Sequence, residues 1–235
     1  MKIVSWNCNG GFRKKYTELF NAYPDADLFM VQECENPDFY DSQEYKALFL
    51  NGFHVGTPDC PMKGIGIFAP KGNSLRRTKC QYGNSSHMLG YAFFEVDKIY
   101  KMLAVWPHGK YVEEMIDFSR LNEALFTKDL LIMGDTNSCS VFNKHHPKNK
   151  NHDVLVALLS DNGLVDAYNY CTGEPEGNES TPTFYLQRKK EKPYHLDRCF
   201  IASERIISFK VAKNHDNWLR LSDHIPIEVE IKNER

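Results

Sequence analysis

The chain has 235 residues, of which 42% are hydrophobic and 26% are charged, a composition typical of a folded globular protein and not of a disordered one. Its formal net charge of -2 at pH 7 provides no overall attraction to nucleic acid, so polyanion binding would need a local basic patch or a bound metal ion. The seven cysteines form no CxxC pair and no regular spacing, which disfavours a disulfide framework and indicates free thiols.

The N-terminus lacks the charged-then-apolar layout of a signal peptide. No apolar run approaches the roughly 20 residues that are needed to span a bilayer. With free thiols, these features predict a soluble cytoplasmic protein with no membrane segment. We find no repeat, low-complexity tract or linker, so we expect one domain that covers residues 1–235.

The first half of the chain predicts short strands and two helices. An apolar opening at Ile3–Trp6 runs into a Gly-rich turn, and aromatic and aliphatic residues then recur at helical spacing from Phe12 until Pro24 ends the helix. Val112–Phe126 is the second predicted helix. The strands are expected at Leu28–Val31, Ile65–Ala69, Leu89–Val96 and Ile99–Trp106.

The second half adds one helix and several strands. His152–Asn162 is predicted to be helical, with Gly163 where a left-handed cap is wanted. Strands are expected at Leu130–Met133, Thr183–Leu186, His195–Ala202, Ile206–Val211 and Ile225–Ile231. Continuous apolar strands indicate sheets that are covered on both faces. Helices lie between some strands and hairpin-like turns between others, which predicts a layered α/β sandwich.

Polar residues stand at the ends of apolar strands in five places. Each one alone is explained as a turn or capping residue, and Asp197 could pair with Arg198 or Arg220. If the strand ends converge, however, several carboxylates share a small space, where like charges raise one another's pKa values and a bound cation relieves the repulsion. Oxygen ligands favour Mg²⁺ or Mn²⁺. The residues are Asn7 and Asn9, Glu33, Asp135 and Asn137, Asp197, and Asp223 with His224.

A hard metal ion, a histidine and spare carboxylates are the groups that phosphate ester hydrolysis needs. The metal ion polarises phosphoryl oxygens and neutralises developing charge. One carboxylate can deprotonate water, and the histidine can hold the phosphate while a second carboxylate fixes its tautomer.

Five short segments occur in an order that resembles the endonuclease/exonuclease/phosphatase superfamily. Their positions span nearly the whole chain, and the ordered set is far more specific than any one segment. The resemblance implies an α/β fold of the DNase-I-like kind, a four-layer sandwich with two central mixed β-sheets. The segments are Ser5–Gly10 (SWNCNG), Gln32–Glu33, Gly134–Asn137 (GDTN), His195–Asp197 (HLD) and Ser222–His224 (SDH).

The resemblance also implies roles for individual residues. Asp135 matches the aspartate that activates water, His224 the histidine that binds the scissile phosphate, and Asp197 the aspartate that orients this histidine. Asn137 matches a residue that contacts the phosphate. Glu33 matches the magnesium ligand, and Asn7, Asn9 and Asp223 match positions at the metal site, with Asn7 also near the phosphate.

Other parts of the chain match the pattern of the family less closely or depart from it. His108 is the candidate to assist the leaving group, although its register is ambiguous and a loop histidine without a role explains it nearly as well. His195 and Arg198 replace residues common in the family, which predicts an altered pocket wall. Thr181–Tyr185 resembles a threonine-aromatic segment of many members, and a plain strand explains it equally well.

Three short stretches of the chain are basic, and two of them are candidates for contacts with phosphate. Lys71–Lys79 is read as solvated surface, whereas Lys144–Lys150 and Arg188–Lys192 are expected at the rim of the site, with Lys144 as a substrate contact. The pair His145–His146 lacks further ligands at zinc spacing.

We therefore expect a Mg²⁺-dependent nuclease that acts on DNA or RNA by in-line attack of water. The alternative is a phosphatase or phosphodiesterase on a small or lipid-derived ester, such as an inositol phosphate or a sphingomyelin-like substrate. A non-catalytic binding module on the same scaffold is a third possibility, disfavoured because the catalytic side chains are all present.

Overall fold

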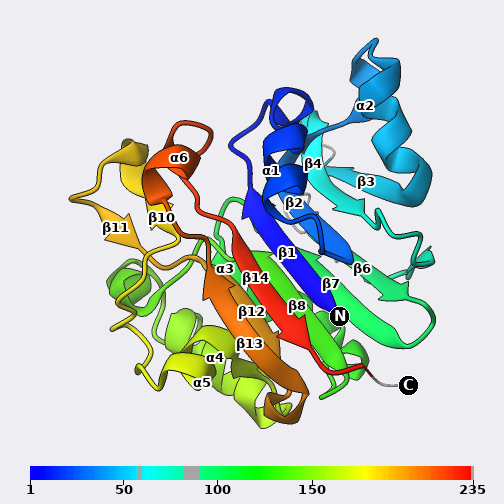
Figure 1. The fold of residues 1–235 in the computed structure, drawn as a ribbon. Helices are drawn as coiled ribbons and strands as arrows, with labels where there is room; N and C mark the ends of the chain where they lie inside the picture. Colours follow the sequence, from blue (N-terminus) through cyan, green and yellow to red (C-terminus); the bar gives the residue numbers. More distant parts are fainter. Residues whose placement is uncertain (58–59, 82–89, 234–235) are drawn as a thin grey trace.

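Two mixed six-stranded β-sheets form the centre of the structure, a computed structural model that describes residues 1–57, 60–81 and 90–233 (Figure 1). Within these residues each sheet has one parallel pair of strands, β1–β2 in the first and β7–β8 in the second. The first sheet runs, in spatial order, β13 (Ile206–Val211), β14 (Ile227–Ile231), β1 (Lys2–Asn7), β2 (Leu28–Glu35), β4 (Cys60–Phe68) and β3 (Gly52–Thr57). The second runs β5 (Leu75–Arg77), β6 (Tyr91–Val96), β7 (Tyr100–Val105), β8 (Leu130–Asp135), β12 (Asp197–Ile201) and β9 (Val165–Asp166).

Successive side chains of a strand point to opposite faces of the sheet, so continuously apolar strands make both faces apolar. In β8, Leu131 and Met133 face the first sheet, whereas Leu130 and Ile132 pack outward. In β1, Ile3 faces the second sheet and its neighbours Val4 and Trp6 pack outward.

Helices cover both outer faces and so complete a four-layer sandwich. On the outer face of the second sheet, α3 (Val112–Leu121) and α4 (His152–Asp161) bury residues such as Met115 and Leu155 against β8. Over the first sheet, α1 (Tyr16–Ala22), α2 (Gln43–Ala47) and α6 (His215–Leu219) contribute Leu19, Tyr45 and Trp218. The predicted layered α/β class is therefore confirmed.

Smaller elements lie at the edges of the sandwich. The helix α5 (Ala167–Thr172) packs beside β12 and β13, and β10 (Phe184–Tyr185) pairs with β11 (Pro193–Tyr194). Short 3₁₀ turns, including Ser140–His145, connect several elements. No helix among the described residues is long and apolar enough to cross a membrane.

Strand direction brings the polar strand ends to one edge of the molecule. The parallel strands β1 and β2 end at Asn7 and Glu35, and β8 ends at Asp135. The antiparallel strand β12 begins at the same edge as β8 ends, because Asp197 pairs with Asp135 in the register. The segment that carries His224 enters β14 in the same way, since Ile227 pairs with Ser5 near the end of β1.

Two of the predicted helices are wrong in extent. The first is interrupted at Lys15, whose φ of -129° is not helical, so that a 3₁₀ turn at Phe12–Lys14 precedes α1. The second ends at Asn122, where the side-chain Nδ2 donates to the carbonyl of Phe118 at 2.9 Å and closes the last turn.

The other predicted elements are found at their positions. The strands β1, β2, β4 and β8 are longer than predicted, β13 has the predicted bounds, and the rest are shorter by one to three residues. The helix α4 ends as expected, and Gly163 adopts φ +78° after it. Leu89, at the start of one predicted strand, lies outside the described residues. Sequence patterns missed the short elements α2, α5, α6, β3, β5, β9 and β11.

Gly134 connects the core of β8 to the polar edge, and we predict that it tolerates no side chain. Its φ is +147°, and a Cβ atom there would lie 2.2 Å from the Val105 carbonyl oxygen of β7. Gly134→Ala should therefore destabilise the fold by roughly 3 kcal/mol, from backbone strain and overpacking together. Gly72→Ala is the matched control, since Gly72 has φ +83° but open space around it, and its cost should be about 1 kcal/mol. Urea unfolding measures both, and equal losses would contradict the steric argument.

Candidate active site

Asp135 is held by two hydrogen bonds at the polar edge. Asn7 Nδ2 donates to Asp135 Oδ2 at 2.9 Å, and the backbone amide of Asn137 donates to Asp135 Oδ1 at 2.8 Å. The residue is 1% exposed, so its carboxylate is both oriented and largely removed from water. Since Asn7 belongs to the first sheet and Asp135 to the second, this contact joins the two sheets.

His224 and Asp197 form a buried hydrogen-bonded pair next to Asp135. The imidazole Nδ1 lies 2.8 Å from Asp197 Oδ2, and Nε2 lies 3.8 Å from Asp135 Oδ2. Binding of Nδ1 to a carboxylate fixes the ring orientation and leaves Nε2 to face a ligand. The backbone of His224 is fixed as well, because its carbonyl accepts from Trp6 Nε1 at 3.0 Å and its amide donates to Ser222 Oγ at 3.1 Å.

The charges of this group shift the pKa values of its members. Burial alone would lower the pKa of His224, but the negative charges of Asp197 and Asp135 and the hydrogen bond to Asp197 raise it to about 10. Burial raises the pKa of Asp135 to about 6, and the charge of Asp197 adds to this effect, while the His224 cation and the bonds from Asn7 and Asn137 oppose it. At neutral pH the group is an imidazolium between two carboxylates.

Asn9, Asp223 and Glu33 form the more exposed side of the site. Asn9 Nδ2 donates to Asp223 Oδ1 at 2.8 Å, and its backbone amide donates to Asn7 Oδ1 at 3.0 Å. Glu33 follows Gln32, the register partner of Asn7, and has φ +55° at an irregularity in the pairing of β2 with β4. Strained backbone of this kind is concentrated at functional sites.

Glu33 forms an ion pair that the sequence did not predict. Lys63 Nζ of β4 lies 3.0 Å from Glu33 Oε2. Among the described hydrogen bonds and ion pairs, the Glu33 side chain contacts Lys63 and neither Asp135 nor His224. The role of Glu33 as a metal ligand therefore stays a prediction.

The donor chemistry of this edge fits a hard divalent cation. Asp135, Asp197 and His224 offer three atoms within 4.8 Å of one another, but the His224–Asp197 hydrogen bond already uses two groups of this trio. The trio is therefore better suited to proton transfer and phosphate binding. The carboxylates of Glu33 and Asp223 and the Oδ1 of Asn7 stay the predicted oxygen ligands of such a cation. Lys63 beside Glu33 shows that this position accommodates positive charge.

Asn137, His108 and Lys144 are the remaining predicted residues, and the structure places them in loops and turns. Asn137 Nδ2 donates to the carbonyl of Pro107 at 3.4 Å, so the loop that carries His108 lies beside Asn137. The His108 ring itself packs against Trp106, with 3.9 Å between ring centroids. Lys144 is exposed on the 3₁₀ turn at Ser140–His145. Their roles stay predictions.

The basic stretches lie in different surroundings. Lys71 pairs with Asp27 at 3.0 Å, in accordance with a solvated surface. The ammonium group of Lys15 donates to the carbonyls of Cys8 and Gly10, next to Asn9. Burial lowers the pKa of Lys15, and the positive charge of Arg188 adds to this lowering.

A row of aromatic rings extends from His224. The His224 ring lies 4.6 Å from Phe184, Phe184 lies 6.3 Å from Tyr194, and Tyr194 lies 5.0 Å from Phe142, measured between ring centroids. All three aromatic side chains are partly exposed. In the sequence, Phe184 belongs to the Thr181–Tyr185 segment that resembles the family. No sequence pattern indicated that Phe184 and Phe142 belong to one row of rings.

Arg198 does not alter the pocket wall and does not pair with Asp197, so both of these readings are wrong. Adjacent residues of a strand point to opposite faces. Arg198 is fully buried behind the site, where its guanidinium group binds Asp166, Glu176 and Glu179 at 3.0, 2.7 and 3.2 Å.

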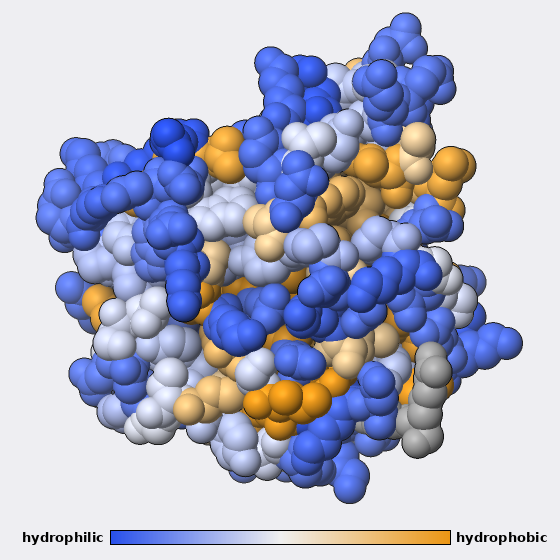
Figure 2. Space-filling model, in the orientation of Figure 1, coloured by the Kyte–Doolittle hydropathy of each residue, from blue (hydrophilic) through white to orange (hydrophobic). Residues whose placement is uncertain are grey.

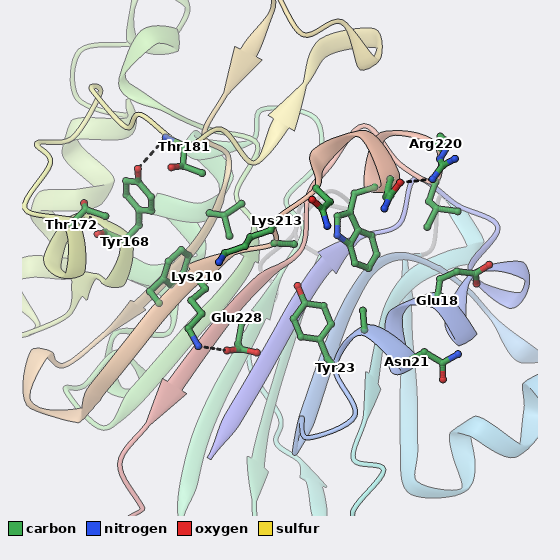
Figure 3. A pocket seen from close by; sticks show the side chains of 18 residues that line it. Glu18, Asn21, Tyr23, Tyr168, Thr172, Thr181, Lys210, Lys213, Arg220 and Glu228 are labelled. Carbon is green, nitrogen blue, oxygen red and sulfur yellow. Dashed lines mark hydrogen bonds and ion pairs between the residues drawn. The ribbon is translucent and has the colours of Figure 1, made fainter.

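A groove of about 1130 Å³ lies away from this chemistry. It is hollowed into the outer face of the first sheet beside α1 and α6, and contains none of the predicted site residues (Figure 3). Lys210 and Glu228 form an ion pair in it, and Tyr23 also lines it. On this face of the molecule, apolar side chains gather in a hollow within a largely hydrophilic surface (Figure 2). Size alone therefore does not identify the active site.

Comparison with known proteins identifies the fold. No family model matches the chain, and no curated protein matches it in sequence. Solved structures do match over the full length. A 3'-5' exonuclease (NExo) from Neisseria meningitidis has 17% identity and a TM-score of 0.69, over 99% of this chain and 100% of that one. An AP endonuclease from Archaeoglobus fulgidus has 16% identity and a TM-score of 0.71, with the same shares covered.

This fold is DNase-I-like. The endonuclease domain of TRAS1, a telomere-specific non-LTR retrotransposon, is also similar, with 15% identity and a TM-score of 0.60 over 100% of this chain and 99% of that one. At such identities the likeness establishes the shared fold. The DNase-I-like fold predicted from the order of the sequence segments is therefore confirmed.

We predict that Asp197→Asn lowers the pKa of His224 from about 10 toward its usual 6.5. The raised value means that the pair stabilises the DNase-I-like fold fully below pH 6.5, and that this contribution is lost as pH rises through about 10. NMR titration of the His224 ring measures the shift. Asp117→Asn, which removes a carboxylate paired with Lys150, is the control and should leave His224 unchanged. An unchanged His224 in Asp197→Asn would contradict the assignment.

Lys63 should compete with a divalent cation for Glu33. We expect Lys63→Met to tighten Mn²⁺ binding by roughly 2- to 5-fold, the modest size appropriate to a partly exposed ion pair. Titration calorimetry measures the affinity directly and requires no substrate. Lys71→Met, which removes an ion pair on a different part of the surface, is the matched control and should have no effect. Weaker Mn²⁺ binding in Lys63→Met would show instead that Lys63 supports the site.

Proposed function

We propose that this chain is a metal-dependent phosphodiester hydrolase that acts on nucleic acid. The observation that carries the proposal is the group formed by Asp135, Asp197 and His224, in which an imidazolium and an oriented carboxylate lie 3.8 Å apart. An enzyme that hydrolyses phosphate esters needs both an anion-binding cation and a proton acceptor within reach of one substrate. The DNase-I-like fold of structures described as exonuclease, AP endonuclease and endonuclease supports it.

In the proposed reaction, Asp135 takes the proton of the attacking water. Its raised pKa, about 6, makes it a stronger base than an ordinary aspartate while it stays mostly ionised at neutral pH. The protonated Nε2 of His224 holds a phosphate oxygen, and Asp197 keeps the ring in that orientation. Glu33, Asp223 and Asn7 would hold a divalent cation, Mg²⁺ or Mn²⁺, which supplies charge neutralisation at the phosphate when bound.

Three features favour nucleic acid as the substrate. The rings of Phe184, Tyr194 and Phe142 form a row beside His224, and partly exposed aromatic rings stack with bases. Lys15 provides positive charge beside the turn of Asn9, where flanking phosphates would lie. One of the similar structures is described as the 3' phosphatase NExo from Neisseria bound to a product DNA hairpin.

A small or lipid-derived phosphate ester is the second candidate substrate. The net charge of -2 favours it, because a chain with no basic excess attracts a long polyanion only weakly. For a small ester the aromatic row would have no obvious role, which is why we place nucleic acid first.

A substrate panel with Mg²⁺, Mn²⁺ and EDTA tests the proposal. It should contain single- and double-stranded DNA, abasic DNA, RNA, inositol phosphates and a sphingomyelin analogue. We expect turnover of at least one nucleic acid that EDTA abolishes. We further expect Glu33→Ala, Asp135→Asn and His224→Ala each to lower kcat by about 10³-fold or more with the fold intact, because each removes a group acting on the reacting atoms.

The matched control for the panel is Lys71→Ala, which removes a surface ion pair and should keep full activity. Thermal unfolding of every variant separates lost chemistry from lost structure. Full activity in Asp135→Asn or His224→Ala would refute the mechanism, and turnover confined to the small esters would transfer the assignment to the second candidate.

A further inference from the structure

The segment after β8 alternates between the active site and the interior. Asp135 and Asn137 belong to the site, whereas Thr136 and Ser138 are 0% and 1% exposed. Thr136 Oγ1 donates to the Leu196 carbonyl at 2.8 Å, and Ser138 Oγ lies 2.9 Å from His152 Nδ1. The buried hydrogen bonds of Thr136 and Ser138 therefore hold the backbone on both sides of Asn137 in place.

The hydrogen bond at Ser138 continues into a chain of buried polar contacts. His152 Nε2 lies 3.0 Å from Glu176 Oε1, and Glu176 binds Arg198 through two contacts of 2.7 and 2.8 Å. Arg198 is the neighbour of Asp197 on β12. The network thus starts one residue from Asn137 and ends one residue from Asp197.

Ser138, His152 and Glu176 have the arrangement of a serine–histidine–carboxylate triad, but they cannot form a second hydrolytic centre. Ser138 and His152 are each 1% exposed, so no substrate reaches the hydroxyl group. Burial lowers the pKa of His152, which keeps its ring neutral. Since the Glu176 carboxylate only accepts, Nε2 carries the ring proton and Nδ1 accepts the hydroxyl proton of Ser138.

We propose that Ser138 and His152 are positioning residues, which hold the loop of Asp135 and Asn137 in register with Asp197. This inference rests on the proposed function of the same site. An oriented buried contact suits this task, because a small misplacement of reacting groups lowers the rate strongly while binding is maintained. The loop needs such support, since Asn137 has φ +50°, a conformation that a residue other than glycine seldom adopts.

Ser138→Ala tests the inference, with Ser119→Ala as a matched control. Ser119 of α3 is also a buried serine, 2% exposed, whose hydroxyl group donates to the Ile116 carbonyl at 2.8 Å, outside the site. Both variants lose one buried hydroxyl group, and urea unfolding measures the stability that each one loses. We expect kcat to fall about 10-fold or more in Ser138→Ala with KM nearly unchanged, and neither to change in Ser119→Ala.

The hydrogen-exchange rate of the Asn137 amide provides a measurement that does not depend on catalytic activity. This amide donates to Asp135 Oδ1, so its exchange reports the order of the loop. We expect exchange about 10-fold faster in Ser138→Ala and unchanged in Ser119→Ala. If both variants show equal kcat and equal exchange, the positioning role is overturned. If the wild type hydrolyses nothing but the amide responds, the proposed function fails while the positioning role is supported.

Discussion

The site depends on one set of contacts between the two sheets. His224 lies just before β14 of the first sheet, whereas Asp197 and Asp135 belong to the second sheet. Asn7, in β1 of the first sheet, donates a hydrogen bond to Asp135. These hydrogen bonds of 2.8 to 2.9 Å form only if the sheets pack at the right separation and register. The apolar layer between the sheets sets that separation, so the core determines the chemistry as well as the stability.

Electrostatics explains why this edge needs cations. Asp135, Asp197, Asp223 and Glu33 bring four carboxylates to one region, and His224 neutralises one charge. Lys63 forms an ion pair with a second carboxylate, Glu33, and the ammonium group of Lys15 donates to the carbonyls of Cys8 and Gly10 in the neighbouring turn. A divalent cation at Glu33 and Asp223 would complete this balance.

Buried polar contacts support the residues of the candidate site from the side of the protein interior. Thr183 Oγ1 accepts from the amides of Leu196 and Asp197 at 3.0 and 2.9 Å, and Ser222 Oγ donates to the Asn7 carbonyl at 2.7 Å. With the network of Ser138 and Arg198, these contacts leave the site little freedom to rearrange. Such rigidity fits a site that stabilises charge through groups held in advance in the required geometry.

The layered fold and the residues that meet at the candidate site could be predicted from the sequence alone. Continuous apolar strands of the length seen at Leu130–Met133 are buried on both faces wherever they lie, and Asp135 and His224 follow from short ordered segments. The partners of Arg198, Lys63 and Ser138 could not be predicted in this way, since each of these residues contacts residues far away in the chain. The break of the first helix at Lys15, whose ammonium group binds the turn before it, could not be predicted either. Such contacts depend on which side of a strand faces which neighbour, and local patterns of hydrophobicity carry no record of that choice.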